Sequence, residues 1–206
     1  MWLLASPQLL LGSASPRRLE LLRQLQIPVE QIVLEQQADD EPRLHEEPVI
    51  EYVVRTSGDK NRRVLDHIQS HAPMLEDLPV LTADTTVAIG QSILGKPHDD
   101  SDARQTLRQL SGQTHDVYTA VTLSWREQTL HALSHSRVTF RNMTDQEIAA
   151  YVRTGQANGK AGAYGIQGCA AAFVSRIEGS YTGIVGLPLF ETTRLMLDMK
   201  LLRAAN

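Results

Sequence analysis

The sequence predicts a single α/β domain over residues 1–206, with a mixed, partly antiparallel sheet flanked by helices. Two observations predict this fold class. In the first half of the chain, strand-like and helix-like segments alternate, which is typical of parallel strands connected by helices. In the second half, neighbouring strand-like segments indicate antiparallel hairpins. No stretch rich in Gly or Ser separates domains, and an arrangement of two lobes around a cleft is compatible with the same pattern.

The first predicted unit is a strand, a turn and a helix. Residues 9–11 are three consecutive leucines, which is typical of a short buried strand. Ser15 can cap the following helix, and Pro16 suits its first turn because that position needs no N–H donor. Residues 27–34 form a second predicted strand, and a long helix is expected over residues 48–71.

The second half of the chain is predicted to hold most of the sheet. Residues 78–89 are the most strand-like segment, and residues 117–125 and 130–140 resemble two paired strands joined by a polar turn. Thr144 and Glu147 have the spacing of a capping box, which predicts a helix start. The remaining predicted elements are an extended piece at 93–97, a helix capped by Asp100 or Ser101 and ending near 112, a helix over 145–153, a hairpin of strands at 170–177 and 181–185, and a final helix after Pro188.

The composition excludes several classes of protein. With 20 basic and 24 acidic residues the formal charge is −4, so the chain lacks the basic surface that nucleic acids and anionic membranes select. No segment approaches the roughly 18 apolar residues of a membrane helix, and the N-terminus has no basic secretion signal, so a cytoplasmic location is expected. The single cysteine, Cys169, excludes an internal disulfide, and we expect it to be a small buried residue.

The first candidate for chemistry is the segment 13–18, between the first predicted strand and its helix. A helix N-terminus presents free backbone N–H groups and a positive dipole end, which attract phosphate. The hydroxyls of Ser13 and Ser15 and the guanidinium groups of Arg17 and Arg18 would strengthen that attraction. A solvent-facing arginine pair after an ordinary helix cap explains the same residues equally well.

The second candidate is Asp84, which lies inside the apolar segment 78–89. A carboxylate in a buried strand is costly unless it has a partner or a role. Asp84 could act as a general base toward water or as a ligand of a hard cation such as Mg²⁺, whereas capping of a neighbouring loop is the structural alternative. Lys96, held between a Gly and a Pro, could neutralise phosphate, although alone it is typical of a surface turn.

The third candidate is the glycine-rich and alanine-rich segment 160–168. Its small residues flank Tyr164 and Gln167 and would let the backbone approach a flat ligand closely. The Gln167 amide offers one acceptor and two donors, which is enough to pair with the edge of a pyrimidine ring. An ordinary glycine-rich loop explains the small residues but not the clustering of Lys160, Tyr164 and Gln167.

The histidines do not form a convincing metal-binding pattern. His131 and His135 can share one face of a strand or helix, but no carboxylate or cysteine spacing accompanies them. His115 is expected to be structural. The chain also contains neither the HExxH nor the GxSxG motif.

Several motifs occur in an order that resembles the Maf nucleotide pyrophosphatases. They are residues 13–22 (SASPRRLELL), 82–85 (TADT), 95–97 (GKP), 110–115 (LSGQTH) with Val117 and Thr119, and 186–189 (GLPL). Residues 160–168, followed by residues 179–181, are similar to the dTTP/UTP pyrophosphatase branch, and the branch that acts on 7-methyl-GTP differs there. The resemblance covers nearly the whole chain.

The resemblance implies a Maf/ITPase-like fold, a cytoplasmic homodimer and a divalent metal cofactor, Mg²⁺ or Mn²⁺. It implies hydrolysis of dTTP and UTP, with modified pyrimidine nucleotides as a further option, to the monophosphate and pyrophosphate, and no nucleic-acid or membrane partner. Carried over position by position, it implies Asp84 as proton acceptor, Arg17, Thr85 and Gln167 in substrate specificity, Ser13, Ser15, Arg18, Lys60, Lys96 and Lys160 in phosphate binding, and Glu41 and Asp84 as metal ligands.

The sequence also departs from the family pattern and leaves two alternatives open. Gln156 and Gly159 stand where the family often has Glu and Asp, so two negative charges are missing before Lys160. Ser57 and Gly58 replace a usual Leu-Ala pair, and a helical Gly costs about 1 kcal/mol relative to Ala. The alternatives are a non-catalytic nucleotide-binding regulator of cell division and septum formation, and a pyrophosphatase of the 7-methyl-GTP type.

Overall fold

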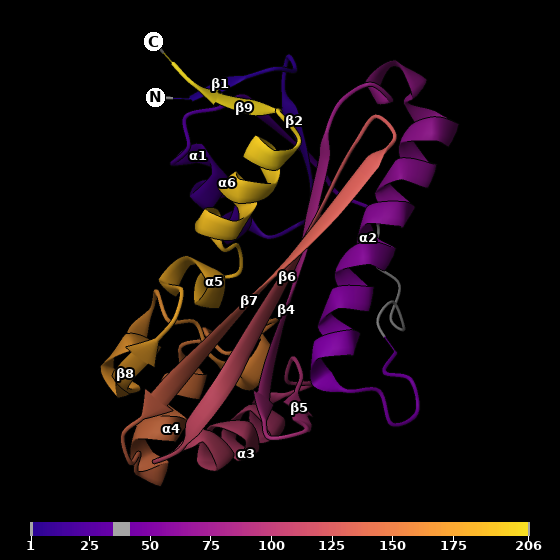
Figure 1. Cartoon of the computed structure of the whole chain (residues 1–206). Coiled ribbons are helices and arrows are strands. Elements are labelled where there is room, and N and C mark those ends of the chain that lie inside the picture. Colours follow the sequence, from indigo (N-terminus) through magenta and orange to yellow (C-terminus); the bar gives the residue numbers. More distant parts are fainter. Residues whose placement is uncertain (1, 35–41, 206) are drawn as a thin grey trace.

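The computed structural model describes residues 2–34 and 42–205 and has the predicted mixed α/β architecture (Figure 1). The strands are β1 (Trp2–Leu4), β2 (Leu9–Gly12), β3 (Val29–Ile32), β4 (Val80–Ile89), β5 (Ser92–Leu94), β6 (Thr114–Trp125), β7 (Gln128–Phe140), β8 (Val174–Glu178) and β9 (Leu202–Ala204). The helices are α1 (Pro16–Arg23), α2 (Val49–His71), α3 (Asp100–Leu110), α4 (Asp145–Arg153), α5 (Tyr181–Val185) and α6 (Leu189–Asp198), with short 3-10 helices η1 (Pro73–Leu75), η2 (Ala161–Ala163) and η3 (Cys169–Phe173).

The main sheet mixes parallel and antiparallel strands, as predicted. Its order is β3-β2-β4-β6-β7-β8, with β5 paired to the far end of β4, while β1 and β9 form a separate two-stranded sheet. β2 runs parallel to β3 and to β4, and the other pairs are antiparallel. The three leucines of β2 are fully buried, as expected for a strand covered on both faces.

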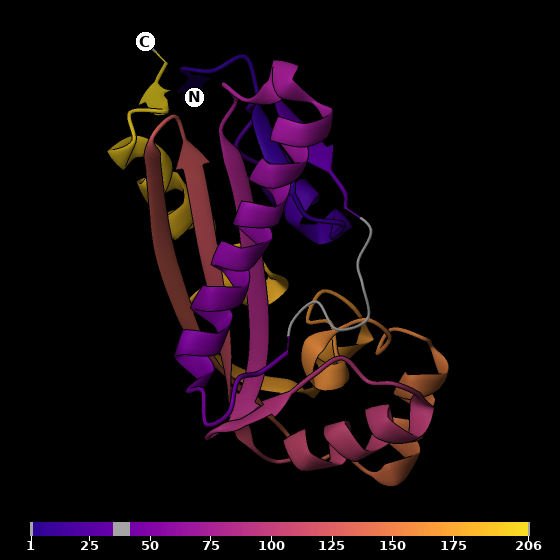
Figure 2. The same ribbon diagram turned by 90° about the vertical axis from the view of Figure 1, so that its right-hand side faces the viewer.

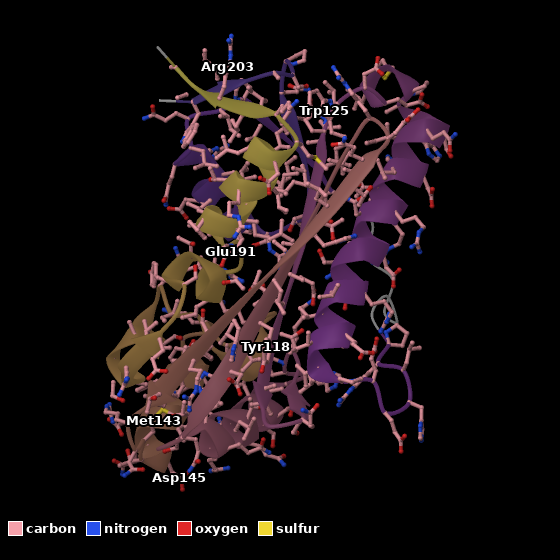
Figure 3. The ribbon with its side chains drawn as sticks, in the orientation of Figure 1. Tyr118, Trp125, Met143, Asp145, Glu191 and Arg203 are labelled. Carbon is pink, nitrogen blue, oxygen red and sulfur yellow. The ribbon has the colours of Figure 1, made fainter. Side chains whose placement is uncertain are left out.

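Helices cover both faces of the long strands β4, β6 and β7. α2 packs along one face, and α5 and α6 pack on the other (Figure 1). α3 and α4 pack together at one end of the sheet, where the view from the side shows them beneath the strands (Figure 2). The long strands span the molecule, with Trp125 at one end of β6, Tyr118 part way along it and Asp145 of α4 near the opposite end (Figure 3).

The predicted starts of α1 and α4 are confirmed, and a local side-chain cap determines each of them. The Ser15 hydroxyl accepts a hydrogen bond from the Arg18 amide, and Thr144 with Glu147 forms the predicted capping box. α3 differs by one residue, because the Asp99 carboxylate, not Asp100 or Ser101, caps it. Within residues 2–34 and 42–205, no helix is long and apolar enough to cross a membrane.

The predicted hairpin of strands at 170–177 and 181–185 is wrong. The second segment forms helix α5, because the Ser180 hydroxyl accepts a hydrogen bond from the Gly183 amide at 3.0 Å and thereby caps a helix start. β8 pairs instead with β7, far back in the sequence. Cys169, expected to be buried, is exposed.

Candidate active site

A pocket of about 510 Å³ opens where β4 loses its neighbour on one edge. β2 pairs with β4 only as far as Leu81, and β5 joins the same edge only from Val87 onward. Between these two points, none of the described strands pairs with that edge of β4. The side chains of Asp84 and Thr85 therefore reach one pocket from opposite faces of the strand: Asp84 faces α2, and Thr85 faces α1.

The pocket brings together all the predicted site residues that the structure describes. Ten of them line it: Ser13, Ser15, Arg17, Arg18, Lys60, Asp84, Thr85, Lys96, Lys160 and Gln167. The eleventh, Glu41, lies outside the described residues. These residues come from α1, α2, β4 and three loops, so the chain positions them through its tertiary fold.

The backbone at Gly12 packs closely against α2 and forms one wall of the pocket. A Cβ atom at Gly12 would lie 2.7 Å from Val64 Cγ2 and 2.8 Å from Thr82 Cγ2, so only Gly fits where β2 turns into the following loop. Beyond it, the Ser13 hydroxyl accepts a hydrogen bond from the Ser15 amide at 3.2 Å. The loop therefore enters α1 in a defined conformation, with the helix N-terminus facing the pocket.

Arg18 connects three segments that are distant in the sequence. Its Nε donates to the Gly186 carbonyl at 2.8 Å, Nη1 to the Ser13 hydroxyl at 3.1 Å and Nη2 to the Thr85 hydroxyl at 3.2 Å. The planar guanidinium presents its donors in a fixed fork, so it holds these three acceptors in one relative position. The resemblance implies phosphate binding by Arg18, whereas these contacts indicate that Arg18 first positions two pocket hydroxyls.

Asp84 is paired inside the pocket wall. Its side chain is 7% exposed, and its Oδ1 lies 2.7 Å from Lys60 Nζ. Thr86 Oγ1 donates to the other carboxylate oxygen at 3.3 Å. This pairing offsets the cost of burying the carboxylate and fixes its orientation. Lys60, expected to bind phosphate, thus contacts Asp84.

The described lining of the pocket is strongly cationic. Its charged members are six cations, Arg17, Arg18, Lys60, Arg63, Lys96 and Lys160, and one carboxylate, Asp84. Burial, together with the positive charge of Arg17, lowers the pKa of Lys160. Repulsion among such groups is relieved when an anion binds between them, so the electrostatics favour a ligand with several negative charges.

The described residues do not form an all-protein metal cage. No group of three or more His, Cys, Asp or Glu side chains gathers within residues 2–34 and 42–205. Asp84 alone offers a carboxylate to the described part of the pocket. Mg²⁺ is commonly held by one or two carboxylates together with substrate phosphates and water. Asp84 therefore fits an ion that arrives with a phosphorylated ligand.

A loop containing Tyr164 and Gln167 forms another wall. It approaches β4 through Gly162, which has a φ of +69° and where an added Cβ atom would lie 2.9 Å from Val87 Cγ1, so both the backbone and the space require Gly. Tyr164 is buried, and Gln167 is exposed within the pocket lining. A buried ring beside an accessible amide can contact a flat heterocycle by its face and its edge.

His115 supports this wall from behind. Its Nε2 lies 2.8 Å from the Tyr164 hydroxyl, and its ring packs edge-on against Phe140 and Tyr164. Burial lowers the pKa of His115 to about 4. His115 itself does not line the pocket, so the expectation of a structural histidine agrees with its position.

The stability of the fold is expected to fall as the pH decreases from about 6.5 to about 4. In this window the unfolded chain binds a proton on His115 and the folded chain does not, so acid favours unfolding by up to about 3 kcal/mol. Urea denaturation between pH 7 and pH 4 measures this dependence. His115→Gln is expected to flatten the curve, while His98→Gln, at an exposed position, should keep it. Equal slopes in both variants would contradict the assignment.

His131 and His135 lie outside the described lining of the pocket. His131 shares a hydrogen bond of 2.9 Å with the Thr122 hydroxyl, and His135 Nε2 lies 2.7 Å from Asp116. Thr122 also bonds Ser57 at 2.9 Å between α2 and the sheet. The unusual Ser57 therefore belongs to a buried polar contact that holds α2 in place beside Lys60.

Sequence reasoning missed several pocket residues. Arg63 and Val64 lie on the same face of α2 as Lys60, and their spacing of three and four residues from it was a usable signal. No sequence pattern indicated that Ile184 and Val185 line the pocket. Their segment, 181–185, was predicted to be a strand of a hairpin.

Known proteins resemble this chain over nearly its whole length. The family model described as Maf-like protein matches residues 8–199. A dTTP/UTP pyrophosphatase of Cupriavidus pinatubonensis is 50% identical over 94% of this chain and 97% of that protein. Proteins of the same name from Bordetella parapertussis and Escherichia coli O157:H7 are 48% and 47% identical, over 92% and 95% of this chain and 91% and 94% of their own lengths.

Similarity to solved structures is weaker. The Ham1 protein of Staphylococcus aureus superimposes with a TM-score of 0.42 at 9% identity, covering 65% of this chain and 71% of that chain. A similarity at this level carries no argument about function.

Proposed function

The chain belongs to the Maf-like family, and from that premise we propose that it hydrolyses dTTP and UTP to their monophosphates and pyrophosphate. The observation that carries the proposal is the buried, ion-paired Asp84 in a pocket whose other charged residues, among those described, are all cationic. Such a pocket combines a candidate proton acceptor with the charge needed to hold a triphosphate. The shared name of the relatives supplies the substrate class.

Asp84 is proposed to act as the general base. It accepts a proton from a water molecule, whose oxygen forms a bond to the α-phosphorus, while the bond from the α-phosphorus to the bridging oxygen breaks and pyrophosphate leaves. Lys60, at 2.7 Å, keeps the carboxylate oriented toward the reacting water. Thr86 limits rotation of the same group through its hydrogen bond to the second oxygen.

The cations of the pocket neutralise the triphosphate so that a carboxylate can act beside it. Arg17, Lys96 and Lys160 line the same pocket as the N-terminus of α1, whose dipole adds to their attraction. A divalent ion, Mg²⁺ or Mn²⁺, would add charge neutralisation on the phosphoryl oxygens, and Asp84 with Glu41 is proposed to hold it. The role of Glu41 is proposed on the basis of the family resemblance alone.

Base selection is proposed to depend on Gln167, with Thr85 and Arg17. An amide can present either its donor or its acceptor, so Gln167 needs a fixed orientation to prefer uracil or thymine. Thr85 is itself held by Arg18 and by Thr119, whose hydroxyl donates to it at 3.0 Å. A fixed hydroxyl beside the ligand is one means of making that preference strict.

Gln156, which replaces a usual acidic residue, is satisfied inside the fold. Its Oε1 accepts from the Cys169 amide at 2.9 Å, and its backbone carbonyl accepts from Lys160 Nζ at 2.6 Å. The missing negative charge leaves the wall near Lys160 more cationic. We propose that this change strengthens binding of the triphosphate and leaves the proton acceptor unaffected.

A nucleotide panel tests the proposed function directly. Pyrophosphate release is expected from UTP and dTTP in the presence of Mg²⁺ or Mn²⁺, with 7-methyl-GTP turned over at least tenfold more slowly. Release measured with and without a chelator separates the metal requirement from the substrate preference. Tight binding of UTP without release would support a nucleotide-binding regulator, and preference for 7-methyl-GTP would support the sister activity. Homodimer formation and cytoplasmic location stay predictions.

A further inference from the structure

We propose that Arg63 binds the β- and γ-phosphates of the substrate, the part that leaves as pyrophosphate. This inference rests on the proposed function, and it adds a binding residue that neither the motifs nor the family resemblance indicated. The evidence is the position of Arg63 on α2, the order of groups along β4, and the ion pair between Lys60 and Asp84.

Arg63 shares the pocket-facing side of α2 with Lys60 and Val64. Val64 is the residue that packs against Gly12, directly before the predicted phosphate-binding loop. A helix rises about 1.5 Å per residue, so the Cα atom of Arg63 lies about 4.5 Å further along the axis of α2 than the Cα atom of Lys60. The side chain of Arg63 thus enters the pocket beside the start of that loop.

Strand β4 orders the groups of the pocket from one end to the other. Gly12 meets β4 at Thr82, Lys60 meets it at Asp84, and the loop with Tyr164 and Gln167 meets it at Val87 through Gly162. Thr82 and Val87 are five residues apart, about 17 Å along a strand. The reacting centre at Asp84 therefore lies between the base-recognition loop and the Gly12 end.

If a nucleotide binds along β4 in this order of groups, its β- and γ-phosphates can extend in only one direction. With the base at the Gln167 loop and the α-phosphorus at Asp84, the β- and γ-phosphates extend toward Gly12. α2 runs antiparallel to β4 here, since Ser57 contacts Thr82 whereas Asn61 contacts Val80. Arg63, beyond Lys60, therefore lies at the Gly12 end.

Charge supports the same assignment. The ammonium group of Lys60 is engaged by Asp84 at 2.7 Å, which offsets part of the positive charge that this helix brings to the pocket. Arg63 is the next pocket-lining cation on α2. A guanidinium group grips phosphate oxygens in a bidentate manner, so it suits two adjacent phosphates better than a single ammonium does.

Binding measurements on three variants test this inference. Arg63→Gln removes the charge, Arg63→Lys keeps the charge without the fork, and Arg62→Gln is the matched control. Arg62 is adjacent, 73% exposed and paired with Asp59, and it does not line the pocket. The ligands are UMP and a UTP analogue with a methylene bridge between the α- and β-phosphates, whose affinities are measured by calorimetry.

Arg63→Gln is expected to weaken binding of the triphosphate analogue about ten- to a hundredfold and binding of UMP less than twofold. Arg63→Lys should fall between Arg63→Gln and the parent protein. Thermal melting of each variant checks that the fold is retained, and Arg63→Lys serves as the decisive variant if the glutamine substitution unfolds the chain.

Two results would overturn the inference. If Arg63→Gln binds the analogue as well as Arg62→Gln does, Arg63 makes no phosphate contact. If UMP and the analogue weaken equally, the contact is with the nucleoside or the α-phosphate. Failure of the proposed function is distinct from both, because the parent protein would then release no pyrophosphate from UTP or dTTP.

Discussion

Asp84→Asn is expected to lower kcat for UTP and dTTP by about 10²- to 10⁴-fold, the contribution typical of a general base. The amide has nearly the same shape as the carboxylate and can still accept a hydrogen bond from Lys60, so the pocket should keep its form. It cannot take a proton from the attacking water. The measurement is pyrophosphate release under single-turnover conditions, with circular dichroism as a check on the fold.

Asp116→Asn is the matched control for this variant. Asp116 also lies on a central strand and is also paired, with His135 at 2.7 Å, but it does not line the pocket. We expect it to retain nearly the full rate. Equal rates for Asp84→Asn and Asp116→Asn would remove the proposed base and, with it, the mechanism.

Arg18→Lys is expected to reduce kcat/KM about a hundredfold, although the charge is retained. Lysine cannot reproduce the fork that bonds Gly186, Ser13 and Thr85 at the same time. Losing two hydrogen bonds made by a charged donor costs about 3 kcal/mol, and the freed hydroxyls would lose their fixed positions in the pocket. Steady-state kinetics with UTP and thermal melting together measure both effects.

The comparison with Arg23→Lys separates positioning from simple charge. Arg23 ends the same helix, is exposed and lies outside the pocket lining, so its replacement should have little effect. If Arg18 acted only as a positive charge toward phosphate, Arg18→Lys would keep most of the activity. Activity close to that of Arg23→Lys would therefore show that the three hydrogen bonds of Arg18 do not position the site.

Features that depend on neighbouring residues were predictable from the amino-acid sequence. The Ser15 cap with Pro16 and the capping box of Thr144 and Glu147 follow from interactions within a few residues. The three consecutive leucines of β2 predict a buried strand by their residue type alone. Segment 181–185 is the informative failure. Its residues suit a strand, but Ser180 and Gly183 make a cap that starts a helix there.

The contacts among the candidate residues, in contrast, depend on how distant parts of the chain pack together. Arg18 reaches Thr85 and Gly186 across 67 and 168 residues, and Lys60 reaches Asp84 across 24. No local pattern encodes such contacts, because they depend on where β2 leaves β4 and on how α2 packs across the gap. The residue types therefore indicated phosphate chemistry. The roles of Arg18, which positions Ser13 and Thr85, and of Asp84, which is paired with Lys60, became visible only in the long-range packing of the chain.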